Sequence, residues 1–314
     1  MREKSGIGRW LKLIVSEAAV VAALYFLVRH LVNNWGQIAP SLRNMRLGYV
    51  VAAFVPILVM LLTVSWGWTL AVRWVGSSLG GRAGFAIYYR SSIFRYLPGS
   101  FWYLPGRAYL CRERGISLKA FASSAFVELF FLLAAAGVLG GYAVAVRFEL
   151  VWLLGVSLVC LLSVVLALLW PGQLRRLVVR GNNLESDRSN AREGALRASL
   201  SVIVFVYLCS WLMYGVSLEL LLLALDVPAA KSTGNAVYVV SASVTAWMAG
   251  FLSLIPTGLG IREAALAGMF CSIAPAEHVI VASLVQRTIE ILLEGCLWMV
   301  SLWLGGREMK IIPK

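Results

Sequence analysis

Two stretches of this chain place arginines beside proline–glycine breaks, and the first carries Arg95, Pro98, Gly99 and Arg107. The chain is 60% hydrophobic, and these breaks interrupt an apolar run. A broken, charged backbone segment at membrane depth is tolerated only where protein or a water-filled cavity covers its free polar groups. The planar guanidinium of arginine forms paired hydrogen bonds with phosphate. This stretch is therefore suited to holding a phosphate group within a membrane.

The second stretch contains Pro256, Gly258 and Gly260 and leads directly into Arg262 and Glu263. A helix that starts after such a break offers free N–H groups and the positive end of its dipole to an anion. The two stretches together predict a site for a lipid phosphate, to which each contributes an arginine.

Each break is followed by a glutamate in the next span, Glu128 in the first half and Glu290 in the second. In the last span, Arg287, Glu290 and Glu294 share one helical face by their i, i+3, i+7 spacing. An ionisable group inside a span costs at least about 2.5–3.5 kcal/mol on insertion scales, so it faces a partner or a cavity. Two interpretations stay open. The charges bind substrate, or they form structural ion pairs, with Glu128 or Glu263 as partners of the arginines or within the last span itself. The candidate lipid-binding residues are Arg95, Pro98, Gly99, Arg107, Glu128, Pro256, Gly258, Gly260, Arg262, Glu263, Arg287 and Glu290.

Composition identifies an integral membrane protein. Only 14% of the 314 residues are charged, against about 25% in an average soluble domain. The net charge of +13 comes from basic residues at the ends of apolar spans. This distribution favours topology determinants and attraction to anionic headgroups over nucleic-acid binding.

The sequence lacks the residue patterns of several common catalytic and binding sites. The five cysteines have no paired spacing, which predicts neither disulfides nor a metal site. The aspartates are Asp187 and Asp226 alone, so an Asp-x-Asp site for nucleotide sugars is absent, and no phosphate-binding loop ends in Gly-Lys. We therefore predict a protein that is not an enzyme and has no cofactor, although a role as accessory to a lipid-modifying transferase stays open.

The apolar spans predict an all-α polytopic fold. Full spans of about 20 residues or more are expected at residues 7–31, 47–75, 117–146, 150–170, 199–225 and 277–304. The segments beside the first break, residues 85–97 and 101–112, are each about half a crossing. Residues 236–255 lead into the second break, and a short apolar helix is expected at residues 262–273. We interpret each such pair as a re-entrant helical hairpin, which gives six full spans plus two hairpins, or eight spans if the hairpins cross.

This order predicts an inverted repeat within a single transmembrane domain, residues 1–314. Repeat 1 covers about residues 7–146, repeat 2 about residues 150–304, and a flexible cytoplasmic loop covers residues 171–194. With both termini cytoplasmic, the basic residues fall on the inner side, as the positive-inside bias requires. Inverted repeats with paired broken segments commonly build a transport site near the bilayer midplane.

These motifs resemble the lysylphosphatidylglycerol synthase transmembrane-region family, and the resemblance covers nearly the whole chain. The segments that carry it are Tyr96-Leu97-Pro98-Gly99, Gly106-Arg107, Arg114-Gly115-Ile116-Ser117 leading to Glu128, and Pro256-Thr257-Gly258-Leu259-Gly260-Ile261-Arg262-Glu263 with Glu290 in the next span. The resemblance implies a flippase-like module that moves lipids. We expect a stand-alone member without the soluble aminoacyl-transferring domain, because the sequence reaches Lys314 soon after its last span.

We therefore expect a multi-pass lipid transporter of the bacterial inner membrane, of flippase or scramblase type. Its substrate would be a phosphate-bearing lipid such as a phospholipid, an aminoacyl-lipid or a polyprenyl-linked glycolipid. The alternatives are a membrane subunit of a lipid-modifying transferase and a scaffold of an envelope-lipid complex. The expected partners are membrane lipids and not nucleic acid, and a separate lipid-modifying synthase and a homo-oligomer stay open.

Overall fold

The computed structural model describes residues 29, 32, 35–96, 102–149, 151–179, 190–227, 233–253, 258 and 260–308. Within these ranges every regular element is a helix and there are no strands, as the sequence predicts. The elements are α2 (Trp35–Arg43), α3 (Leu47–Val75), α4 (Gly81–Ser92), η1 (Ile93–Tyr96), α5 (Tyr103–Glu113), α6 (Leu118–Phe148), α7 (Trp152–Leu169), α8 (Pro171–Val178), α9 (Asn190–Ala224), α10 (Thr233–Leu252), α11 (Ile261–Phe270) and α12 (Ala276–Glu308).

Four helices among the described residues, α3, α6, α9 and α10, are long and apolar enough to cross a membrane. A fifth span results if α7 and α8, which are bent by 96° at their junction, count as one. The helix α12 has the length of a span, but Arg287, Glu290 and Glu294 interrupt its apolar character. The predicted span at residues 7–31 lies almost wholly outside the described residues. The prediction of six full spans therefore stays a prediction.

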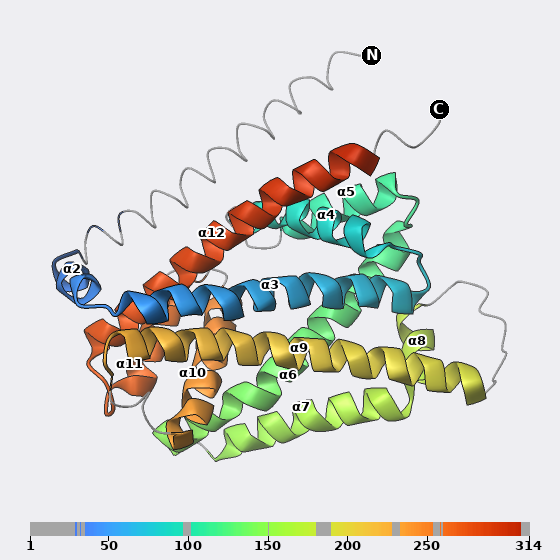
Figure 1. The fold of residues 1–314 in the computed structure, drawn as a ribbon. Helices are drawn as coiled ribbons and strands as arrows, with labels where there is room; N and C mark the ends of the chain where they lie inside the picture. Colours follow the sequence, from blue (N-terminus) through green and yellow to red (C-terminus); the bar gives the residue numbers. More distant parts are fainter. Residues whose placement is uncertain are drawn as a thin grey trace, which may run out of the picture.

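The helices α3 and α9 pack against each other along the middle of the molecule (Figure 1). Close packing depends on small residues, since a methyl group added to Gly67 of α3 would lie 2.8 Å from the ring of Tyr207 on α9. On the two sides of this central pair, α4 packs against α12 and α10 packs against α6. The first helix of each broken segment thus contacts the helix that follows the other broken segment.

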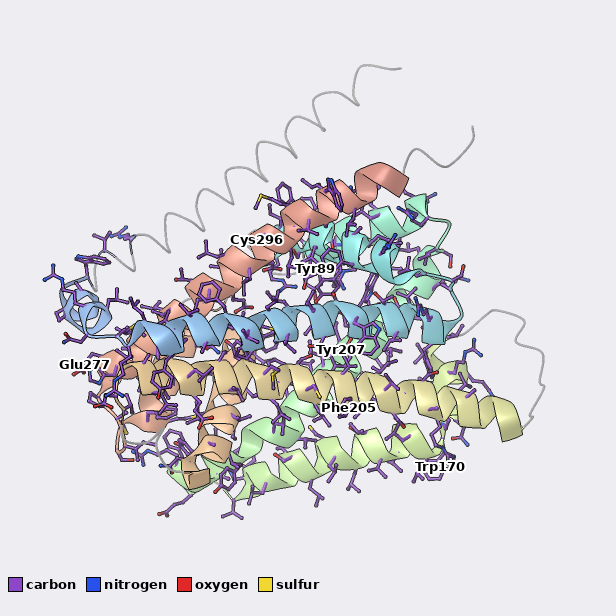
Figure 2. The ribbon with its side chains drawn as sticks, viewed as in Figure 1. Tyr89, Trp170, Phe205, Tyr207, Glu277 and Cys296 are labelled. Carbon is purple, nitrogen blue, oxygen red and sulfur yellow. The ribbon has the colours of Figure 1, made fainter. Side chains whose placement is uncertain are left out.

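Large side chains lie on both the inside and the outside of this bundle (Figure 2). Tyr89 and Tyr207 are fully buried between helices, whereas Phe205 and Trp170 are at least half exposed. An apolar exterior is expected where the surrounding solvent is lipid, because burial between helices brings no hydrophobic gain there.

Both predicted breaks separate helices. The segment α4–η1 ends at Tyr96 and α5 begins at Tyr103, and α10 ends at Leu252 before α11 begins at Ile261. Pro98 and Gly99 in the first break, and Pro256 in the second, lie outside the described residues. Helices lie on both sides of each break, as the sequence predicts, but α10 is long and apolar enough to cross a membrane by itself. The re-entrant path of each pair stays a prediction.

The predicted flexible loop at residues 171–194 is wrong at both of its ends, which are helical. The helix α8 begins with Pro171, whose fixed φ suits a first helical position, and α9 already begins at Asn190. The Ser123 hydroxyl on α6 donates a 2.7 Å hydrogen bond to the carbonyl of Val178, which ties the end of α8 to the bundle. Residues 180–189 lie outside the described part of the chain.

Candidate functional site

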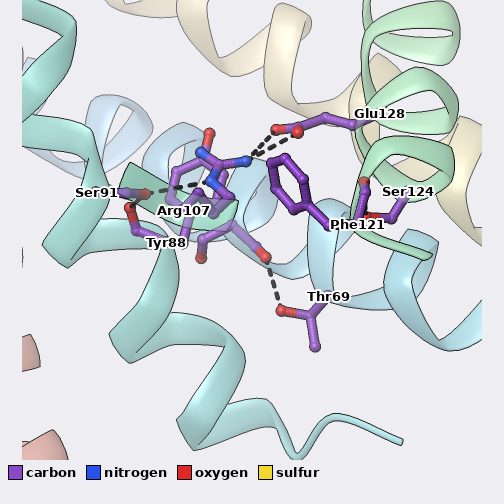
Figure 3. A network of polar contacts seen from close by, with 8 residues as sticks. Thr69, Tyr88, Ser91, Arg107, Phe121, Ser124 and Glu128 are labelled. Atoms are coloured by element: carbon purple, nitrogen blue, oxygen red, sulfur yellow. Dashed lines mark hydrogen bonds and ion pairs between the residues drawn. The ribbon is translucent and has the colours of Figure 1, made fainter. Parts of the chain in front are cut away.

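Arg107 on α5 forms a buried ion pair with Glu128 on α6 (Figure 3). Its Nη1 donates to both carboxylate oxygens of Glu128, at 2.9 and 3.1 Å, and its Nε donates to the Ser91 hydroxyl on α4 at 3.2 Å. The Arg107 side chain is 0% exposed and that of Glu128 is 5% exposed. These hydrogen bonds offset much of the cost of burying the two charges, whereas Nη2 of Arg107 is buried without a hydrogen-bond partner among the described residues.

Three aromatic rings surround the same guanidinium. The Cζ atom of Arg107 lies 4.0 Å from the ring centre of Tyr88, 4.8 Å from that of Trp68 and 5.1 Å from that of Tyr103. Such contacts add cation–π attraction to the ion pair. The interpretation of Arg107 as a structural ion pair with Glu128 therefore fits this arrangement. The predicted phosphate contact does not fit it, because Arg107 has no exposed surface from which to reach a ligand.

Arg262, the counterpart in the second half, is held far more loosely. Its Nη1 lies 3.5 Å from the Tyr214 hydroxyl on α9, and its Cζ atom lies 5.5 Å from the ring centre of Trp247 on α10. Its Nε is buried and has no hydrogen-bond partner among the described residues. No carboxylate among the described residues lies within ion-pair distance of the Arg262 guanidinium.

Glycines position Arg262. Gly258 has φ +68°, and a side chain there would meet the backbone of Gly250 at 2.6 Å. A methyl group on Gly250 would lie 2.6 Å from Cγ of Arg262. The second break thus folds back onto α10, and the arginine lies across the surface that Gly250 leaves free.

Glu263 does not pair with Arg262, which was one of the predicted alternatives. Its Oε2 accepts a 2.8 Å hydrogen bond from the N–H of Gly260, which has φ +80° and precedes α11. Its Oε1 pairs with Nη1 of Arg287 at 3.5 Å, and both side chains are buried. Glu263 therefore closes the start of α11 and joins it to α12.

Arg95 pairs with Glu294 of α12 at 3.4 Å. Glu294 is buried, and it was not among the predicted site residues although it shares the helical face of Arg287 and Glu290. The pair connects the first broken segment to the last helix, so the charges on α12 act between elements.

Side chains from both halves line one cavity of about 140 Å³. Its charged residues are Arg95, Glu128, Arg262, Arg287 and Glu290, and Gly258 also lies on its wall. Arg107 does not line it. The cavity thus brings together most of the described candidate residues, whereas Arg107 lies behind its wall and contacts it through Glu128.

Aromatic side chains form much of the remaining wall. The rings that line the cavity are Tyr88, Tyr103, Trp211, Tyr214, Trp247 and Phe251. Sequence reasoning missed those on α9 and α10, because aromatics within apolar spans give no signal that separates a cavity wall from ordinary packing. Within the described ranges, no group of three or more histidine, cysteine or acidic residues could hold a metal ion.

Comparison with known proteins gives one finding at the level of the family. No curated protein matches the chain. The sequence pattern of the family described as "Lysylphosphatidylglycerol synthase TM region" matches residues 9–296, nearly the full length. This match includes both broken segments, the cavity and the buried pair of Arg107 with Glu128. The chain therefore belongs to the lysylphosphatidylglycerol synthase transmembrane-region family.

Proposed function

We propose that this integral membrane protein moves a phosphate-bearing lipid between the two leaflets of the bacterial inner membrane, as a flippase or scramblase. The observation that carries the proposal is the cavity between the two halves, which is lined by Arg262, an arginine without a carboxylate partner among the described residues. Arginine is suited to phosphate because its planar donors match two phosphate oxygens. An arginine without a counter-ion inside a membrane domain is by default a candidate functional residue.

The size of the cavity fits a headgroup and not a whole lipid. Pockets that enclose a drug-sized ligand measure about 300–1,000 Å³, and this cavity measures about 140 Å³. The acyl chains would therefore remain in the bilayer while the headgroup passes through the protein.

The packing of the helices supports an inverted repeat as the basis of this transport. If α4 corresponds to α10 and α6 to α12, the contact of α4 with α12 corresponds to the contact of α10 with α6, and both contacts are present. Each half also surrounds its arginine with two aromatic side chains from corresponding helices. Trp68 of α3 and Tyr88 of α4 lie beside Arg107. Tyr214 of α9 and Trp247 of α10 lie beside Arg262. We propose that both termini are cytoplasmic, in line with the distribution of basic residues.

The test is lipid movement in reconstituted vesicles that contain acyl-labelled phospholipids. The substitution Arg262→Gln should slow movement by about 10- to 100-fold, because one charge-assisted hydrogen bond contributes about 1.5–3 kcal/mol. The control is Arg46→Gln, which removes a mostly exposed charge and should leave the rate unchanged. Equal rates with and without the wild-type protein would refute the proposal.

A further inference from the structure

The charges that line the cavity do not all have counter-ions. Glu128 pairs with Arg107, Arg95 with Glu294, and Arg287 with Glu263. Arg262 and Glu290 remain, and neither has an oppositely charged atom within 4.0 Å in the part of the chain that the structure describes. The cavity therefore presents one unpaired cation and one unpaired anion.

Glu290 lies on α12, is half-buried and belongs to the cavity wall. The charged groups around it are Arg262 on α11, Arg95 on η1, and Arg287 and Glu294 on its own helix. Two of these arginines are already engaged with other carboxylates. A carboxylate in a membrane domain needs a partner, because burying an isolated charge is costly.

We propose that Glu290 binds an ammonium group of the lipid while Arg262 binds its phosphate, so that the substrate is a zwitterionic phospholipid with one phosphate and one ammonium. This inference rests on the proposed function and specifies its substrate class. One free carboxylate matches a single positive charge on the headgroup. The rings of Tyr214, Trp211 and Trp247 on the same wall are suited to an ammonium, which is attracted to aromatic faces.

The cavity volume supports the same choice. About 140 Å³ accommodates a small headgroup such as phosphoethanolamine. An oligosaccharide needs a larger space and many more hydrogen-bonding groups than this mostly aromatic and aliphatic wall offers. A purely anionic headgroup has no positive charge that could pair with the Glu290 carboxylate, and the carboxylate would repel it.

The experiment measures lipid binding, so that it does not depend on transport. The purified full-length protein is incubated in detergent with equal amounts of phosphatidylethanolamine and phosphatidylglycerol that have identical acyl chains, and bound lipids are quantified by native mass spectrometry. We expect the wild type to prefer phosphatidylethanolamine by about tenfold, which corresponds to about 1.4 kcal/mol. Glu290→Gln should reduce this preference to about twofold or less by removing the charge that attracts ammonium and repels the anionic lipid.

Glu219→Gln is the matched control. Glu219 is a half-buried carboxylate on α9 that does not line the cavity, so its removal should leave the preference intact. Equal binding of the two lipids by the wild type would overturn the inference, and this readout needs no variant to fold. An unchanged preference in Glu290→Gln would also overturn it, as would a variant that changes only the pH dependence of lipid movement, since Glu290 would then carry a proton.

The inference and the proposed function fail separately. A protein that moves both lipids between leaflets at equal rates and binds them equally would retain the proposed function and lose the substrate assignment. A protein that prefers phosphatidylethanolamine through Glu290 but moves no lipid would retain the binding site and lose the transport function.

Discussion

Removing Arg107 should destabilise the protein more than any other single arginine substitution in the cavity region. In Arg107→Met the carboxylate of Glu128 would remain buried without its counter-ion, and breaking a buried pair in this way costs about 3–5 kcal/mol. Up to three cation–π contacts, of about 0.5–1 kcal/mol each at modest desolvation, would also be lost. The free energy of unfolding should therefore fall by about 4–8 kcal/mol.

The assay is reversible unfolding in mixed micelles of increasing denaturing detergent, followed by tryptophan fluorescence and helical circular dichroism. The double variant Arg107→Met, Glu128→Gln should recover about 2–3 kcal/mol relative to the sum of the single variants, because it leaves no unpaired ion. Arg46→Met, which removes an exposed ion pair with Asp226, should change stability by less than about 1 kcal/mol. The reasoning is refuted if Arg107→Met stays within 1 kcal/mol of the wild type, or if the two single losses simply add.

Four further variants divide the roles of the site. Arg262→Gln should leave the free energy of unfolding within about 1 kcal/mol of the wild type while it slows lipid movement, because Arg262 makes only a 3.5 Å hydrogen bond and a 5.5 Å ring contact; a large loss of stability would make it a structural residue. Gly258→Ala should lose about 1–3 kcal/mol in the same unfolding assay, since it combines a positive φ with a backbone collision. Gly250→Ala should displace the Arg262 side chain and lower lipid movement with a smaller effect on stability, and normal transport would contradict this placement. Ser91→Ala should lose about 1.5–3 kcal/mol, the value of a hydrogen bond to a charged group, and no change would mean that water replaces the hydroxyl at Arg107.

The helices were largely predictable from the sequence, because apolar length and proline–glycine breaks act locally. The span predicted at residues 47–75 matches α3, and the span at 117–146 agrees with α6, Leu118–Phe148, to within two residues at each end. The helix α8 was missed because its eight residues are too few for a periodic signal and its arginines suggested a polar loop. Its order comes from tertiary contact, including the hydrogen bond from Ser123.

The pairing of the charges could be predicted only in part. The sequence spacing made Glu128 a candidate partner of Arg107, and the structure shows this pair. The sequence spacing could not assign Glu263 to Arg287, or Glu294 to Arg95, since these pairs depend on how the broken segments meet α12 in space. The unequal roles of Arg107 and Arg262 were hidden for the same reason, because their sequence contexts are alike and only their surroundings in the fold differ.

The right-angled junction of α7 and α8 has a consequence for how the protein responds to bilayer thickness. The 18 residues of α7 span about 27 Å, close to the hydrocarbon thickness of a membrane. If α7 crosses the membrane, α8 at 96° to it runs along the surface and acts as a stop against vertical sliding. A thinner bilayer must then be accommodated by tilt. Because Val178 of α8 is bonded to Ser123, less than two turns from Glu128 on α6, that tilt would act directly on the helix that carries the buried ion pair. The thickness of the surrounding membrane would thus affect the tilt of α6 and, through it, the position of Glu128.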